Sequence, residues 1–201
     1  MRDLLGNLMQ RLTFPKRLAP GAWEVTQEVW GAVHDYPLAK LCVSKDFPAA
    51  ERLAQARLAA AHAPGIAAGA LALALQDLAC VFQIQGQFPR AIAIRKRFRG
   101  LARECVEQKH PGILQFYEIT RKKGARPALP TAWRSPLYEL ACAEEVLAEA
   151  HAADGQLAEA LFGYEYAVEA YSNVGQGAAA QRASKQLALL RQRANLLSRL
   201  R

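Results

Sequence analysis

The chain has 201 residues, of which 52% are hydrophobic, and its formal net charge is +8. This length and apolar content exclude a globally disordered chain and leave room for one domain with a core, or one short array of repeats. Alanine and leucine are abundant, which predicts helix throughout, because both lose little side-chain freedom in a helix. The apolar stretch at residues 65–75 is shorter than the roughly 20 residues of a membrane span, and residues 1–12 do not resemble a secretory signal. We therefore expect a cytoplasmic protein without a transmembrane segment.

Residues 1–30 are expected to form amphipathic helices that pack on the rest of the chain. Trp23 and Trp30 are seven residues apart, so they would share one face of a helix. Core packing of this face is favoured over an exposed stripe that binds a partner. In the alternative, this segment associates with an anionic membrane or a larger assembly. The basic residues that favour the alternative are Arg2, Arg11, Lys16 and Arg17.

A short motif recurs along the next part of the chain. It reads KDFPAA at residues 45–50, GQFPRA at 86–91 and GQLAEA at 155–160. The spacing between the first two copies is therefore shorter than the spacing between the last two. Apolar residues at helical spacing precede and follow the motif, and each copy therefore predicts a helix, a tight turn and a second helix. Glycine suits the end of the first helix because it takes positive φ without a steric penalty. Pro89 suits the first turn of the second helix, where no N–H is needed.

Residues 107–136 are expected to hold one degenerate unit, because the longer spacing is about two steps of a 34-residue repeat. The stretch predicts a short helix near 112–123, followed by a proline-containing loop at 124–136. Ser135 and Pro136 have the features of an N-cap and a first helical residue, so the next helix is expected to begin there.

Residues 172–201 are expected to form a basic helix that caps the array. Apolar residues recur at spacings of three and four from Ala180 to Leu197, and no acidic residue follows Glu169. A terminal repeat needs such a helix to cover its open apolar end. In the alternative, this helix makes a short coiled-coil contact with a second copy, which would give a homo-oligomer.

The repeated motif and its flanks resemble the tetratricopeptide repeat (TPR) family over residues 31–171. That family has a Leu and a small residue before the turn glycine, and an Ala, a large aromatic and an Ala after it. The residues that match are Leu78, Ala79, Leu147, Ala148, Ala160, Tyr164 and Ala167. The shorter spacing, between the copies that begin at Lys45 and Gly86, is similar to the long repeats of kinesin light chains. The resemblance implies an all-α fold, a right-handed superhelix of stacked antiparallel helix hairpins.

Some positions depart from the family's pattern. Lys45 stands where the turn glycine is usual, and Pro37 interrupts the leading helix of the first copy. His151 replaces the aromatic residue that Phe82 supplies in the second copy, and Arg95 stands where an aromatic residue is expected. The resemblance is therefore strongest in the second and third copies.

The resemblance implies a binding groove on the concave surface of the array, lined by the first helix of each hairpin. Family members commonly hold an extended peptide or a partner helix there. The family's carboxylate-gripping Lys, Asn and Arg are absent from the matching positions, and the mixture of Gln and acidic side chains suits a neutral or basic ligand. The implied groove residues are Asp35, Ala39, Gln76, Cys80, Gln83, Glu145 and Glu149.

The sequence contains no phosphate-binding glycine loop, no GxSxG and no HExxH. Glu144, Glu145 and Glu149 lie near Asp154 on one predicted helix and could serve acid–base chemistry if buried together, but a solvated or groove-lining acidic face is favoured. The four cysteines have no CxxC spacing and no nearby histidine cluster, so they are interpreted as core or groove residues rather than metal ligands. We expect no enzyme, no metal and no cofactor.

These observations predict a protein–protein interaction module, an adaptor or scaffold, with a protein or peptide as its partner. The alternative is a basic α-repeat protein that binds RNA or DNA. Its stripe of cations would be Arg95, Arg97, Arg99, Arg103, Lys122, Lys123, Arg182 and Lys185. Only Phe98 and Trp133 interleave with basic residues, whereas single-stranded nucleic acid is commonly held by many aromatic stacking groups. A protein partner is therefore favoured.

Overall fold

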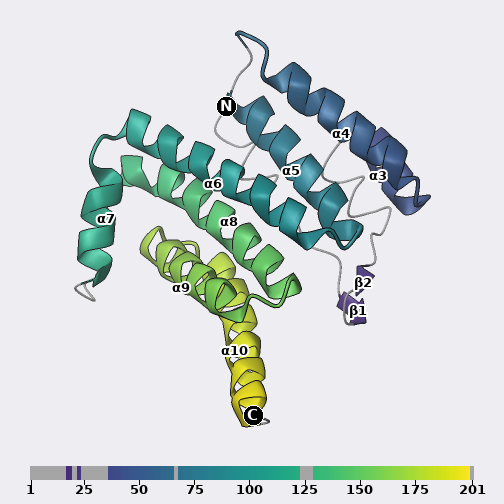
Figure 1. The fold of residues 1–201 in the computed structure, drawn as a ribbon. Coiled ribbons are helices and arrows are strands. Elements are labelled where there is room, and N and C mark those ends of the chain that lie inside the picture. The colour runs from purple at the N-terminus through teal and green to yellow at the C-terminus, as the bar shows by residue number, and fades with distance from the viewer. Residues whose placement is uncertain (1–16, 20–21, 24–35, 66–67, 123–128, 200–201) are drawn as a thin grey trace. The chain divides into compact units, whose positions relative to one another are not determined.

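The computed structural model describes residues 17–19, 22–23, 36–65, 68–122 and 129–199 (Figure 1). The chain divides into two compact units, residues 1–95 and 96–201. The described residues form eight helices, α3 to α10, packed in sequential antiparallel contacts, so the expected all-α fold is confirmed. None of these helices is long and apolar enough to cross a membrane. Residues named above that lie outside the described ranges are Arg2, Arg11, Lys16, Trp30, Asp35 and Lys123.

Two short strands precede the helices. β1 (Arg17–Ala19) pairs antiparallel with β2 (Ala22–Trp23), and Arg17 lies opposite Trp23. The helix expected at Trp23 is therefore wrong. Ala19 precedes Pro20 in the sequence, and a residue before proline is driven toward extended backbone, which favours a strand over a helix.

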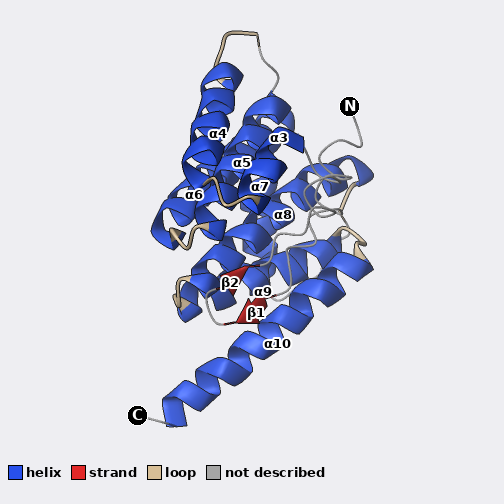
Figure 2. Ribbon diagram, turned by 90° about the vertical axis from the view of Figure 1, so that its right-hand side faces the viewer, coloured by secondary structure: helices blue, strands red, loops and turns tan. Residues whose placement is uncertain are grey.

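The first unit contains α3 (Tyr36–Val43), α4 (Phe47–Ala61), α5 (Ala68–Ile84) and the start of α6 (Phe88–Lys109). α3 packs on α4, and α4 packs on α5 (Figure 2). Pro37 lies in the first turn of α3, where a missing N–H leaves no hydrogen bond unmade. It therefore begins the helix rather than interrupting it. Asp46 caps α4, since its Oδ1 accepts the N–H of Ala49 at 3.2 Å.

The second unit contains the rest of α6, α7 (Ile113–Lys122), α8 (Thr131–Ala153), α9 (Leu157–Asn173) and α10 (Gly177–Arg199). α8 packs on α9, and α9 packs on α10. The helix expected near 112–123 is confirmed as α7. The start expected at Ser135 is wrong, because α8 already begins at Thr131, after Pro130, and contains Pro136. The carbonyl of Pro130 accepts the N–H of Trp133 at 2.9 Å, which closes the first turn.

The hairpin turns at Gly86 and Gly155 have the same geometry. Both glycines have positive φ, 73° and 81°. The N–H groups of Gln87 and Gln156 donate to the carbonyl oxygen five residues earlier, with N···O distances of 2.8 and 2.9 Å. This closure is a Schellman motif, which satisfies carbonyls at the end of a helix. The helix, tight turn and helix expected at both places are confirmed.

The first turn closes in the same way without a glycine. Lys45 has a φ of 61°, and the N–H of Asp46 donates to the carbonyl of Leu41 at 2.9 Å. The left-handed conformation costs a residue with a side chain about 1–2 kcal/mol. The hydrogen-bonding pattern of the turn is therefore kept at the expense of backbone strain.

A fourth copy of the turn, GQGAAA at residues 175–180, was missed in the sequence. Gly175 has a φ of 79°, and the N–H of Gln176 donates to the carbonyl of Tyr171 at 2.8 Å. Only one helix, α9, lies between this turn and the turn at Gly155. Consequently α9 is the second helix of one hairpin and the first helix of the next.

Replacing a turn glycine should destabilise the protein, because alanine cannot take positive φ cheaply. We expect Gly155→Ala to lower the free energy of unfolding by about 1 kcal/mol. Gly100→Ala is the matched control, since Gly100 lies inside α6 with open space around its Cα and no positive φ, and it should raise stability by up to about 1 kcal/mol. Urea unfolding of both variants measures the difference. Equal effects of the same sign would contradict this interpretation of the turn.

Candidate functional site

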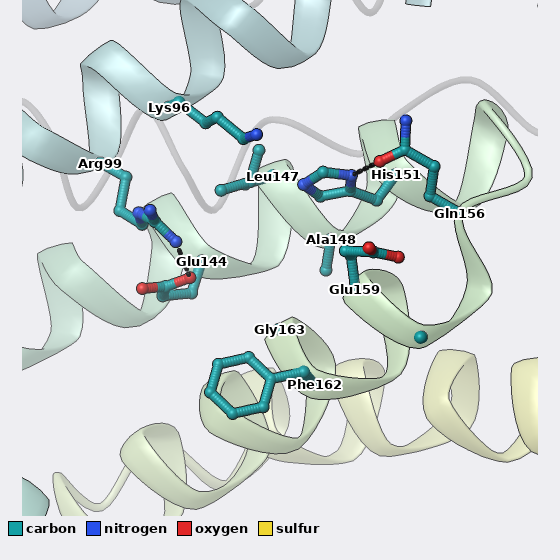
Figure 3. A pocket seen from close by; sticks show the side chains of 11 residues that line it. Lys96, Arg99, Glu144, Leu147, Ala148, His151, Gln156, Glu159, Phe162 and Gly163 are labelled. Carbon is teal, nitrogen blue, oxygen red and sulfur yellow. Dashed lines mark hydrogen bonds and ion pairs between the residues drawn. The ribbon is translucent and has the colours of Figure 1, made fainter. Parts of the chain in front are cut away.

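In the second unit, α6, α8 and the start of α9 enclose a pocket of about 390 Å³ (Figure 3). α6 contributes two cationic side chains, α8 contributes a polar and apolar wall, and the turn and first helical residues of α9 close the other side. The lining residues are Lys96, Arg99, Glu144, Leu147, Ala148, His151, Gln156, Ala158, Glu159, Phe162 and Gly163. The pocket was not predicted, because one of its walls comes from α6, which is far in the sequence from α8 and α9.

Gly163 lets α8 and α9 approach closely at this pocket. A Cβ atom placed on Gly163 would lie 2.8 Å from the Cβ of Ala148 and 3.4 Å from the carbonyl oxygen of Glu144. The first distance is shorter than carbon atoms tolerate, since their optimal separation is about 3.5–4.0 Å. The lack of a side chain at this position therefore sets the spacing of the two helices.

Glu144 places a carboxylate on the α8 wall. Its side chain is almost fully buried, and its Oε2 lies 3.6 Å from Nη1 of Arg99 on α6. Burial raises the pKa of Glu144, while Arg99 and Arg103 oppose this shift. The pair therefore brings charge compensation to a carboxylate that burial alone would tend to neutralise.

His151 is held in one orientation by the turn that follows α8. Its Nδ1 lies 2.6 Å from Oε1 of Gln156, and Nε2 of Gln156 donates to Oδ2 of Asp154 at 2.6 Å. Because Gln156 uses its NH₂ group on Asp154, its oxygen faces the imidazole, and Nδ1 is assigned the proton. In the neutral ring, Nε2 is then a hydrogen-bond acceptor, and Figure 3 shows this second nitrogen on the pocket side, toward Leu147.

The mouth of the pocket combines an exposed ring with charges of both signs. Phe162 is exposed on α9, with the guanidinium of Arg121 5.4 Å from its ring centre. Lys96 and Glu159 are exposed, and within the described part of the chain neither takes part in an ion pair. The arrangement provides an apolar rim, a buried acceptor and charged groups at the opening. Such a pocket can hold a side chain of another molecule.

The groove residues expected on α5 gather instead around a buried arginine. The guanidinium of Arg95 on α6 donates to Oε1 of Gln76 at 3.4 Å, to Sγ of Cys80 at 3.4 Å and to Oε1 of Gln83 at 3.5 Å. Gln76, Gln83 and Arg95 are buried. Arg95 therefore lies inside the first unit rather than on an exposed basic stripe, because a buried guanidinium needs acceptors and α5 supplies them.

The groove residues expected on α8 have partners within the second unit. Glu145 accepts two hydrogen bonds from Arg182 on α10, at 3.0 and 2.7 Å, and one from the hydroxyl of Tyr171 on α9, at 2.7 Å. Glu149, one turn further along α8, is partly buried. Glu145 thus joins three helices, a role that its spacing in the sequence did not indicate. The last expected groove position, Ala39, lies in α3.

Several cations of the expected basic stripe are also paired. Arg99, Arg103 and Arg182 bond to Glu144, Glu118 and Glu145 respectively. Arg182 is exposed although it is paired, and two further positions of the stripe are exposed, Arg97 on α6 and Lys185 on α10. Lys122 is the last residue of α7.

The cysteines form no disulfide. Cys42 and Cys142 are buried, as expected for core residues, while Cys80 and Cys105 are partly exposed. No three His, Cys, Asp or Glu side chains of the described residues are grouped so that they could hold a metal ion.

Comparison with models of protein families, with curated proteins and with solved structures finds no match for this chain.

Removing Arg182 should destabilise the second unit, because Glu145 would lose both guanidinium bonds while remaining mostly buried. We expect Arg182→Ala to cost about 1 kcal/mol, a value reduced for the partial exposure of the arginine. Arg193→Ala on the same helix is the matched control, since Arg193 is exposed, and it should change stability by less than about 0.5 kcal/mol. Urea unfolding compares the two. An equal loss in both variants would show that Glu145 does not depend on Arg182.

Thiol reactivity should separate the cysteines into two pairs. Burial raises the pKa of Cys42 and of Cys142 to about 12, so near pH 8 both remain thiols, which are poor nucleophiles. We expect a thiol reagent at that pH to modify Cys80 and Cys105 first, with all four reacting after denaturation. Raising the pH toward 12 should increase the reactivity of the buried pair. Peptide mapping by mass spectrometry gives the order, and early modification of Cys42 or Cys142 would contradict it.

Proposed function

We propose that this chain is a non-enzymatic interaction module of TPR-like design, an adaptor or scaffold that holds a peptide or a partner helix. The observation that carries the proposal is the recurrence of one hydrogen-bonded helix turn, with a positive φ at Lys45, Gly86, Gly155 and Gly175. Proteins built from stacked helix pairs bury one face of each pair on its neighbour and use the remaining surface to bind other macromolecules. A right-handed superhelix of such pairs is part of this proposal.

The pocket of the second unit supports the proposal as an anchor point. Three acceptors line it, the carboxylates of Glu144 and Glu159 and the Nε2 of His151, while the guanidinium of Arg99 is already directed at Glu144. A partner side chain that carries N–H donors on an apolar stem fits this set, because its donors would meet acceptors and its stem would lie against Phe162. A neutral amide or a basic side chain satisfies both conditions. This agrees with the neutral or basic ligand expected from the sequence.

The pairing of the arginines supports a protein partner over nucleic acid. Five arginines of the second unit form salt bridges with glutamates of the same unit: Arg99, Arg103, Arg121, Arg182 and Arg191. Phosphate groups would have to compete with these carboxylates, whereas nucleic-acid binding gains its strength from cations that are free to neutralise phosphates.

The proposal is tested by blocking the pocket with a bulky side chain. Ala158 and Ala178 are both exposed and both stand three residues after a turn glycine, but only Ala158 lines the pocket. Tagged wild-type protein, Ala158→Trp and Ala178→Trp are used to capture partners from a nuclease-treated lysate of the source cells, followed by quantitative mass spectrometry. We expect a specific protein to be recovered by the wild type and by Ala178→Trp, and about tenfold less of it by Ala158→Trp, a loss of about 1.4 kcal/mol.

Two outcomes would contradict the proposal. Equal recovery by both tryptophan variants would show that the pocket is not part of the binding site. Binding of RNA or DNA that weakens steeply with salt, together with protein that is captured from an untreated lysate but not from the nuclease-treated one, would favour the basic nucleic-acid-binding alternative.

A further inference from the structure

The last turns of α10 carry leucines that the described part of the chain leaves exposed. Leu189, Leu196 and Leu197 are 59%, 55% and 44% exposed. α10 has 23 residues and its neighbour α9 has 17. At a rise of 1.5 Å per residue, α10 is therefore longer than α9 by about 9 Å. Figures 1 and 2 show the end of α10 running on past α9.

The exposed leucines have the spacing of a helix–helix seam. Leu189 and Leu196 are seven residues apart, and Leu197 follows the buried Leu190 by seven. Seven residues are close to two helical turns, so each pair lies along one narrow line of the helix surface. A second helix covers such a line, whereas a helix lying in a membrane surface needs a wide apolar face.

The charges beside these leucines are all positive. Lys185, Arg193 and Arg199 are exposed and, among the described residues, take part in no salt bridge. No acidic residue follows Glu169 in the sequence. Packing this surface against a second copy would bring like charges together, which is unfavourable. A helix flanked by carboxylates would satisfy the same cations.

Where α10 packs on α9, its leucines are buried and one of its cations meets an acidic residue of the neighbouring helix. Leu187 and Leu190 are buried, and Arg191 donates to Glu165 of α9 at 2.8 Å. Leu196, Leu197 and Arg199 repeat this arrangement of leucine and cation at the end of the helix, where the two leucines remain exposed. We infer that the C-terminal part of α10, from Leu189 to Arg199, docks an amphipathic helix of a partner protein whose flanking residues are Asp or Glu. This surface is separate from the pocket and does not rest on the function proposed for it.

The inference is tested with a synthetic helix of defined chemistry. The probe is a fluorescent peptide of about three heptads with Leu at the a and d positions and Glu at e and g, and its control is a peptide of the same composition in scrambled order. Fluorescence anisotropy with the full chain should give micromolar binding of the probe and at least about tenfold weaker binding of the scrambled peptide.

Two variants of α10 locate the binding surface. Leu189→Ser with Leu196→Ser should weaken probe binding by at least about tenfold, and the matched control, Ser184→Ala with Asn195→Ser at exposed polar positions on another side of the helix, should leave it unchanged. Ala158→Trp should also leave it unchanged, which distinguishes this surface from the pocket. Folding of each variant is checked by circular dichroism; exposed leucines can be replaced without creating a cavity.

Four results would overturn the inference. These are no binding of the probe, equal binding of the scrambled peptide, stronger binding to anionic phospholipid vesicles than to the probe, and self-association of the chain that the double leucine variant abolishes. The last two would assign the surface to a membrane and to a second copy.

Discussion

The structure depends on one backbone device, a residue at positive φ that lets the next N–H close on the carbonyl five residues earlier. The closure ends one helix and turns the chain back, so the following helix packs on the one before it. Where the device is used at Gly155 and again at Gly175, three helices follow one another in antiparallel contact. This brings Glu145 of α8 within hydrogen-bonding distance of Arg182 on α10, although the two are distant in the sequence.

The pocket follows from the same turn. Gln156, whose N–H closes the turn, also uses its side-chain oxygen to orient His151, and Asp154 orients Gln156 in return. Further along α9, Gly163 has no side chain and so permits α8 and α9 to pack closely where both line the pocket. The residues that close the turn and those that give the pocket its polarity are therefore close together in the sequence. A substitution in the turn thus also alters the pocket.

Turn chemistry was the part of the fold that the sequence predicted well, because the glycine and the alanine five residues later recur at readable spacings. The fourth turn was missed because Gly177 stands where the other copies have a large side chain. The functional surface was harder to predict, since spacing does not reveal which polar face meets a partner from another helix. Gln76 and Gln83 were expected on an open groove, but Arg95 lies between them.

The double role of α9 restricts how this chain can change over time. The number of residues in α9 fixes the angle, around the helix axis, between the turn at its start and the turn at its end. Each added residue would rotate everything beyond it by about 100° around that axis. A single insertion in α9 would thus aim the cationic side of α10 in a new direction and separate Arg182 from Glu145. The number of residues in α9 is therefore constrained by the turns at both of its ends.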